Sequence, residues 1–389
     1  MRHKRKFLGF SLLCLSLTGI LACSYARYVS TPSLSPPADE WQRFLKAYAV
    51  IKTYYYQPVS DKKLIDDAIN GMLQGLDSHS MYLTQKDMSF VEQLKTGKFS
   101  GIGLEVMPQF DSLKVISPID SSPAQKAGIL PDDEIIAIDD KPVQSMSFRR
   151  AIEALRGPEN TSVKLMIVRA HEEKPLTITV TRGQIIPQNI KSQLIKPNMG
   201  YVRIATFQKN TPEQTRVAIK QLIAQNKAPL KSFILDLRND PGGILESSVG
   251  VSELFLDYQK LGKNPLIVYS ENRDKKVLYS ANPTDKDILN GAPMIILINK
   301  GSASGSEIVA GALHDHHRAK LLGMRTFGKG SVQTVFPFGG DAIKLTTALY
   351  YTPSGKLIDH IGIAPDIEVK MIPHAKPDVQ LARAVEILR

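Results

Sequence analysis

The spacing of hydrophobic residues divides the chain into three regions, and the first region has a helical pattern. Within residues 40–96, apolar side chains recur every three or four positions, as at Leu45, Tyr48, Ile51 and Tyr55. This spacing places them on one face of a helix and predicts about three short helices.

Residues 97–183 change to short runs in which hydrophobic and polar residues alternate or β-branched residues gather. Runs such as LKVISPI, DEIIAIDD, SVKLMIV and LTITVTR favour strands. The stretches SPAQKAGI and SFRRAIEALRG favour helices. The pattern predicts a small, separate β-rich domain.

Residues 184–389 alternate strand-like and helix-like stretches. Apolar runs such as SFILDLR and APMIILIN stand between amphipathic ones such as TPEQTRVAIKQLIAQ and SGSEIVAGALHDHH. Continuous apolar strands separated by helices are typical of an α/β domain with a buried sheet. We therefore expect the largest domain of the chain here.

Residues 1–26 have the composition of a bacterial export signal, and residues 27–39 read as a flexible linker. Four Lys/Arg residues precede an uncharged, Leu-rich stretch that ends among small residues. The linker is rich in Pro and Ser. We expect the protein to be exported to the periplasm of a bacterial cell.

Both cysteines, Cys14 and Cys23, lie in the signal segment, so the folded part has no disulfide to form. The sequence Ile-Leu-Ala before Cys23 resembles a lipoprotein cleavage box, which makes Cys23 a candidate for lipidation. Two alternatives stay open: ordinary cleavage after Ala26, and retention as an anchor, since about 20 apolar residues span a bilayer. Contact with a membrane is expected only through this segment.

The formal net charge of +11 does not indicate a nucleic-acid-binding protein. Four of the cations belong to the signal segment, and the remaining excess is scattered, without a Lys/Arg run or interleaved aromatic residues.

The stretch GSASGSEIVAGAL, residues 301–313, carries three serines before a predicted helix. A G-x-S-x-G elbow would need serine at the position of Ala303. A penicillin-binding arrangement lacks its S-x-N box between the other two. His314 cannot serve as the base, because it lies ten residues beyond Ser304 on the same helix.

A lysine is the remaining candidate for the base, and Lys329 stands between two glycines at the start of a predicted strand in TFGKGSVQTV. A lysine with the ordinary pKa of about 10.4 keeps its proton at neutral pH. Burial on an apolar strand can lower that pKa enough for a base.

Four stretches, GSASGSEIVAGAL, RTFGKGSVQTV, LDLRNDPGGIL and YYTPSGKLIDHIGIAPDIEV, resemble the carboxy-terminal processing proteases, also called tail-specific proteases. The resemblance runs from about residue 40 to the end. It implies a crotonase-like α/β (α+β) protease domain with an inserted PDZ domain and an N-terminal helical region. It also implies a Ser-Lys dyad, with neither a metal nor an organic cofactor.

The family motif implies Ser304 as the nucleophile, Lys329 as the base and Gln333 as a third polar residue. The alternative for Ser304 is a capping box with Glu307 that merely begins the helix. Because a straight strand would separate Lys329 from Gln333 by about 13 Å, a hydrogen bond between them requires a bend.

Two backbone N–H groups are expected to stabilise the oxyanion of the reaction. Gly305 supplies the first, at a helix start where the dipole favours negative charge; the family commonly has Ala there. The second comes from NDPGG, where the resemblance does not distinguish Gly242 from Gly243.

FSGIGLEV and SPAQKAGILPDDEIIAIDDKPV resemble a PDZ domain, a module that binds the C-terminal end of a peptide as an added strand. Gly101 and Gly103 would permit close approach of the peptide carboxylate, and Ile102 and Leu104 would line the pocket for its last side chain. Asp132 and Asp140 stand where turn glycines are common.

Together these features predict an exported serine endopeptidase that acts on proteins or peptides with accessible C-termini, such as unfolded or flexible envelope proteins. An activating partner or a homo-oligomer is left open. The competing hypothesis is a PDZ scaffold or holdase with an inactive protease fold; the presence of both dyad residues argues against it.

Overall fold

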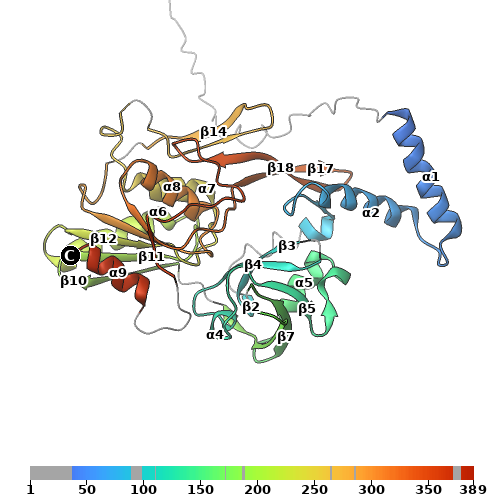
Figure 1. Ribbon diagram of the computed structural model, residues 1–389, viewed down its shortest axis with the longest axis horizontal. Coiled ribbons are helices and arrows are strands. Elements are labelled where there is room, and N and C mark those ends of the chain that lie inside the picture. The colour runs from blue at the N-terminus through green and yellow to red at the C-terminus, as the bar shows by residue number, and fades with distance from the viewer. Residues whose placement is uncertain are drawn as a thin grey trace, which may run out of the picture. The chain divides into compact units, whose positions relative to one another are not determined.

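The computed structural model describes residues 37–88, 99–109, 111–170, 172–185, 189–262, 265–283, 286–370 and 378–389 (Figure 1). The predicted signal segment, Cys23 and most of the predicted linker lie outside these residues. None of the helices in the described ranges is long and apolar enough to cross a membrane.

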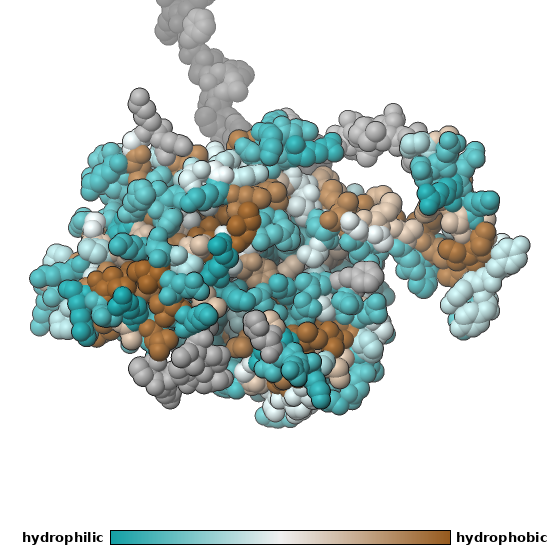
Figure 2. All heavy atoms as spheres, viewed as in Figure 1, coloured by the Kyte–Doolittle hydropathy of each residue, from teal (hydrophilic) through white to brown (hydrophobic). Residues whose placement is uncertain are grey.

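The first two helices, α1 (Ala38–Tyr54) and α2 (Asp61–Gln74), fall in the region that the three- and four-residue spacing predicts as helical. The chain separates into a unit that ends at Ile65 and a second unit that begins at Asp66. No residue of α1 is buried, and Trp41 is 49% exposed. Hydrophobic side chains on this helix therefore face solvent in the structure, and Figure 2 shows brown patches in this region.

The β-rich domain consists of antiparallel strands around a core of aliphatic residues. Its sheet runs β3 (Leu104–Pro108), β4 (Leu113–Pro118), β5 (Glu134–Ile138), β7 (Ser162–Val168) and β8 (Leu176–Thr181), with β6 (Lys141–Pro142) beside β5. The helices α4 (Pro123–Lys126) and α5 (Phe148–Leu155) and the 3-10 turn η1 (Val143–Ser145) complete it. Asp132 and Asp140 have φ of 71° and 62°, so both adopt the turn conformation that glycine favours.

The strands that enter and leave this domain pair with each other. Strand β2 (Phe99–Gly101) is antiparallel to β9 (Gly183–Ile185), with Phe99 opposite Ile185. The domain is therefore inserted into the rest of the chain through two adjacent connections.

The main sheet of the remaining chain is six-stranded and mostly parallel. Its order is β10 (Ile190–Lys196), β11 (Met199–Ile204), β12 (Ser232–Asp236), β15 (Met294–Ile298), β16 (Lys320–Gly323) and β19 (Ile367–Glu368). Only β10 is antiparallel to its neighbour. Every residue of β12 and β15 is buried, as expected for strands covered on both faces.

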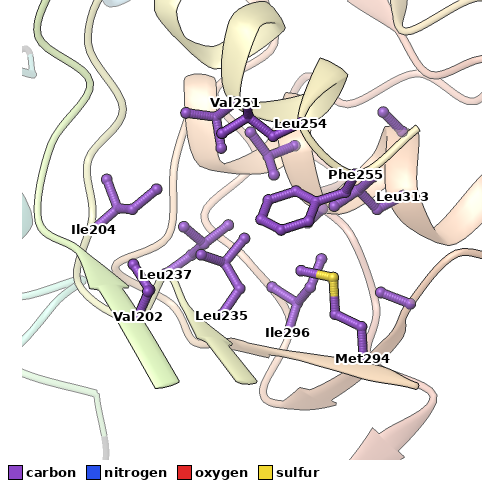
Figure 3. Packing of buried hydrophobic residues seen from close by; sticks show 14 of the residues in the cluster. Val202, Ile204, Leu235, Leu237, Val251, Leu254, Phe255, Met294, Ile296 and Leu313 are labelled. Atoms are coloured by element: carbon purple, nitrogen blue, oxygen red, sulfur yellow. The ribbon is translucent and has the colours of Figure 1, made fainter. Parts of the chain in front are cut away.

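Helices cover both faces of this sheet. One core cluster contains residues of α6 (Thr211–Asn226), α7 (Leu245–Glu253) and α8 (Gly305–Asp315) together with Leu235 and Ile296 of the strands. Figure 3 shows these apolar side chains packed between α7 and the sheet. The alternate strand residues Ile234 and Ile295 pack against α9 (Val379–Ile387) on the other face.

A second, antiparallel sheet joins residues from both sides of the insertion. It contains β1 (Met81–Leu83), β18 (Asp341–Tyr351), β13 (Val268–Glu271) and β14 (Val277–Ala281), with β17 (Ser331–Phe338) on β18. Met81 of β1 lies opposite Lys344 of β18.

Candidate active site

The sequence-predicted nucleophile, oxyanion and base loops follow three neighbouring parallel strands. The loop with Gly242 and Gly243 follows β12, Ser304 follows β15, and Lys329 follows β16. Because the carboxyl ends of parallel strands meet at one edge of a sheet, the three loops come together there, which is where α/β proteins place their sites.

Ser304 lies at the N-cap of α8 in a backbone conformation that is rare for a residue with a side chain. Its φ is 53° and its ψ is −110°. Such strain persists only where the surrounding structure imposes it, and it is found most often at functional sites. Ser302 and Ser306 are buried, and their hydroxyls donate to the backbone carbonyls of Leu237 and Asp240. Ser304 is therefore the accessible member of the three serines.

The oxyanion loop packs directly against the nucleophile. Gly242 has φ of 96°, and a Cβ there would lie 2.8 Å from the Ser304 Cβ and 2.7 Å from the Gly305 nitrogen. Only glycine fits this approach. The Gly242 N–H donates to Asp240 Oδ1 at 2.9 Å. Within the described part of the chain, the N–H groups of Gly243 and Gly305 have no protein acceptor.

A buried charge network supports the strand that leads into this loop. Arg238 contacts Asp236 at 2.6 Å, and Arg203 contacts the same carboxylate at 3.2 Å. Burial would raise the pKa of Asp236, but the charges of Arg238 and Arg203 lower it to about 2. The end of β12 is thus held by an ionised carboxylate at neutral pH.

Glu307 connects the nucleophile segment to the base segment. Its Oε2 accepts the N–H groups of Ser304 and Lys329, both at 2.8 Å. Its Oε1 accepts the Gly328 N–H at 2.7 Å and the Thr326 hydroxyl at 2.6 Å. Sequence analysis found Glu307 only as half of a capping box, because its contacts with the base loop link residues about twenty positions apart.

Burial raises the pKa of Glu307 to about 7, while the four donors to its oxygens favour the ionised form. The side chain is 0% exposed. A carboxylate with this pKa changes its charge near neutral pH, which makes the link between nucleophile and base sensitive to pH.

Lys329 is partly buried at the start of β17. The following Gly330 N–H donates to Asp359 Oδ1 at 3.0 Å, so carboxylates on two elements hold the base loop. A turn near Lys329 contains Asp77 and His79. The backbone N–H of His79 donates to Asp77 Oδ1 at 2.7 Å. Burial and the charge of Lys329 lower the pKa of His79 to about 4, so this imidazole is neutral. Sequence analysis did not find His79.

Gln333 hydrogen-bonds two hydroxyl groups of the antiparallel sheet. Its amide donates to the Ser331 hydroxyl at 2.9 Å and to the Thr346 hydroxyl at 3.4 Å. The register of β17 on β18 shifts between Val332 and Gln333, which supplies a bend in the strand. The bend brings Gln333 to Ser331, and no hydrogen bond joins Gln333 to Lys329 in the described residues.

The PDZ loop requires glycine at Gly103. Its φ is 77°, and a Cβ there would lie 2.5 Å from the Ser122 Cβ. Gly101 approaches Arg156 Cα, where a Cβ would lie at 3.3 Å. Ile102 is 1% exposed and belongs to the PDZ core, so its placement does not support the predicted role in lining a peptide pocket. Leu104 packs partly buried against the same core.

The comparisons with known proteins agree with this architecture. The family model described as Peptidase family S41 matches residues 198–369, and a PDZ domain model matches residues 115–169. A third model, the Activating protease CtpB N-terminal domain, matches residues 25–87.

Relatives match over nearly the whole chain. A carboxy-terminal-processing protease from Bartonella bacilliformis is 40% identical over 349 residues, covering 89% of this chain and 78% of the relative. The carboxy-terminal processing protease CtpA of Bacillus subtilis is 36% identical over 346 residues, covering 88% and 72%. A solved photosystem II D1 C-terminal processing protease has a TM-score of 0.73 at 27% identity, covering 88% and 90%.

Fold and comparisons together define a serine peptidase that carries a PDZ domain. The chain belongs to the carboxy-terminal processing proteases. The resemblance drawn from the four sequence stretches and the predicted fold class are confirmed.

Proposed function

We propose that Ser304 and Lys329 form the catalytic dyad of this protease. The observation that carries the proposal is the carboxylate of Glu307, which accepts the backbone N–H groups of both residues and so fixes the two segments to each other. The strained backbone of Ser304 and its position at a helix start support the same assignment.

In the proposed mechanism, Lys329 acts as the base and takes the proton of the Ser304 hydroxyl as the oxygen attacks the scissile carbonyl. The tetrahedral intermediate collapses to an acyl-enzyme, and Lys329 returns the proton to the leaving amine. A water molecule, deprotonated by Lys329, then releases the acyl group and restores the hydroxyl.

We assign the oxyanion donors to the N–H groups of Gly305 and Gly243. The Gly242 N–H is already donated to Asp240, whereas those of Gly243 and Gly305 donate to no acceptor among the described residues. Donors that are fixed before the reaction stabilise the charge that develops on the carbonyl oxygen. Gln333 has an indirect role, because it binds Ser331 beside the base loop.

The PDZ domain is proposed to capture the C-terminal tail of the substrate as an added strand. Its strand β4 contacts all three site loops. Ser117 donates to the Asn239 carbonyl at 2.8 Å, and Lys114 lies 5.0 Å from the Phe327 ring centre. Ile116 shares an apolar cluster with Ala303. These contacts support a role for the PDZ orientation in controlling access to Ser304.

We propose unfolded or flexible-tailed envelope proteins as substrates, since an extended chain must reach both the PDZ domain and Ser304. Export rests on the signal segment, and anchoring rests on lipidation of Cys23. Radiolabelled palmitate incorporated by the full chain, and absent from Cys23→Ala, would support anchoring; equal labelling of both would contradict it.

The dyad is tested with the full chain and an unfolded protein that ends in apolar residues. We expect cleavage by the wild type and none by Ser304→Ala or Lys329→Ala. Lys320→Ala is the matched control, since Lys320 is exposed at the opposite end of β16 from the base loop. Cleavage retained by Lys329→Ala would assign the base to another residue. A wild type without activity would favour the scaffold, or an enzyme that awaits its activator.

A further inference from the structure

Asp240 is a fully buried acid within the oxyanion loop. Its Oδ1 accepts the Gly242 N–H at 2.9 Å. Its backbone carbonyl accepts the Ala303 N–H at 3.0 Å and the Ser306 hydroxyl at 2.9 Å. Asp240 therefore connects the oxyanion loop to the residues on both sides of Ser304.

The second oxygen of this side chain is the unusual feature. Asp240 is 0% exposed, and its Oδ2 has no hydrogen-bond partner in the described residues. An ionised carboxylate needs donors on both oxygens or a neighbouring cation, and it is costly to bury without them. A protonated carboxyl group is neutral, and burying a neutral polar group that lacks one hydrogen-bond partner costs far less than burying a charge.

The charges around Asp240 do not replace the missing donor. Arg203 of β11 is the neighbouring cation, and its guanidinium is bound to Asp120 at 2.6 Å and to Asp236 at 3.2 Å. The charge of Asp120 opposes ionisation of Asp240. Glu307 of α8 is occupied by the nucleophile and base segments. Burial raises the pKa of Asp240 well above its usual value, and the Gly242 N–H, the charge of Arg203 and the nearby Ser306 hydroxyl offset this only in part.

We propose that Asp240 is a positioning residue that works as a neutral carboxylic acid behind the oxyanion pocket. It binds the Gly242 N–H and so fixes the loop with the Gly243 N–H turned toward the substrate. Because it is neutral, it adds no negative charge beside the tetrahedral oxyanion, which a carboxylate would repel. The inference rests on the proposed roles of Ser304 and the two oxyanion donors.

The protonation state is tested without reference to activity. Infrared spectra of the full chain in a Ser304→Ala background, taken above pH 7 where Glu307 is ionised, should show the carbonyl band of a protonated carboxyl group. The band should be missing from the same chain with Asp240→Asn. Asp274→Asn, an exposed residue of the β13–β14 turn, is the control and should leave the band unchanged. No difference between the spectra would overturn the proposal.

The positioning role is tested by the pH profile of kcat. We expect kcat of the wild type to fall at alkaline pH as Asp240 ionises. Asp240→Asn keeps a neutral group with an acceptor for Gly242, so its kcat should be close to that of the wild type near neutral pH and should not fall at alkaline pH. Asp240→Ala removes the acceptor, and we expect kcat to fall roughly 100-fold with little change in KM. A kcat of Asp240→Asn as low as that of Asp240→Ala would overturn the proposal. So would pH profiles of the wild type and Asp240→Asn that fall equally at alkaline pH. If the wild type cleaves but Ser304→Ala and Lys329→Ala cleave equally well, the dyad proposal fails, and the infrared result still decides the protonation of Asp240.

Discussion

Glu307 shows how one side chain can align a nucleophile and a base that come from different loops. Each of its oxygens accepts two donors. Oε2 binds Ser304 and Lys329, one from each segment, whereas both donors to Oε1 belong to the base loop. In the proposed mechanism, the geometry of the dyad thus depends on a residue that takes no part in proton transfer.

Replacing Glu307 by Gln should lower kcat by roughly 10- to 100-fold. The substitution turns one acceptor oxygen into an NH2 group that faces N–H donors, so either the Ser304 contact or the base-loop contact is lost. Steady-state kinetics with the unfolded substrate would show it. Glu213→Gln is the control, since its side chain is 70% exposed on α6. Unchanged kcat in E307Q would remove Glu307 from the alignment of the dyad.

The raised pKa of Glu307 should also appear in the stability of the protein. Burial raises this pKa from 4.5 to about 7, so the folded chain holds the proton more tightly than the unfolded chain. The stabilisation is fully present below pH 4.5 and is lost as the pH rises through 7, by about 3 kcal/mol. Denaturation of S304A and S304A/E307Q at pH 5 and pH 8 should show the parent losing more stability over this range. Parallel pH dependence would contradict the assignment.

Gly242 and Gly305 both contact Ser304, but only one of them should lose kcat when it is replaced by alanine. A Cβ at Gly242 would clash with backbone atoms and Ser304 at under 3 Å, whereas a Cβ at Gly305 would meet the Phe207 side chain at 3.1 Å and Ser248 Cβ at 3.2 Å. We expect G242A to lose roughly 100-fold or more in kcat, and G305A to stay active, because Gly305 needs no left-handed backbone. Equal losses in both variants would refute this distinction.

At the scale of the elements, the parallel order of β12, β15 and β16 places three loops at one sheet edge. Hydrophobic runs and turn residues predicted these strands and the helices between them, because local spacing encodes burial. Ser304 and Lys329 were assigned through short motifs that resemble those of the family. Asp240, His79 and the second role of Glu307 were not, since their partners lie in other elements. The contacts of Gln333 with Ser331 and Thr346 could not be predicted either, because a bulge cannot be read from the spacing.

Asp120 of the PDZ domain forms ion pairs with Arg203 and Lys191 of the main sheet. Asp120, between β4 and α4, binds Arg203 of β11, and Arg203 also contacts Asp236 beside the oxyanion loop. Asp120→Asn leaves Arg203 its contact with Asp236 but weakens the docking of the PDZ domain over the site. We expect faster cleavage of a short peptide without a tail and less dependence on the tail sequence. A slower or unchanged rate for that peptide would count against control of access by the PDZ orientation.

For the molecule as a whole, the proposed catalytic residues and the proposed recognition site lie in different domains. The α/β core holds the proposed dyad and the proposed oxyanion donors, and the PDZ domain is a separate antiparallel unit with its own apolar core. The comparisons establish the protease class. Under the proposed function, the physiological substrate depends on which tails the PDZ domain accepts.

The pairing of β2 with β9 has a consequence for how such a protease can diversify. Because paired strands lie about 5 Å apart, the two ends of the inserted segment lie side by side. A recombination event that replaced everything between Gly101 and Gly183 with another compact module of adjacent termini would leave the strand register on either side intact. The protease domain can therefore stay unchanged while the inserted recognition domain is replaced. New substrates can then be acquired by exchange of a whole domain, without any substitution near Ser304.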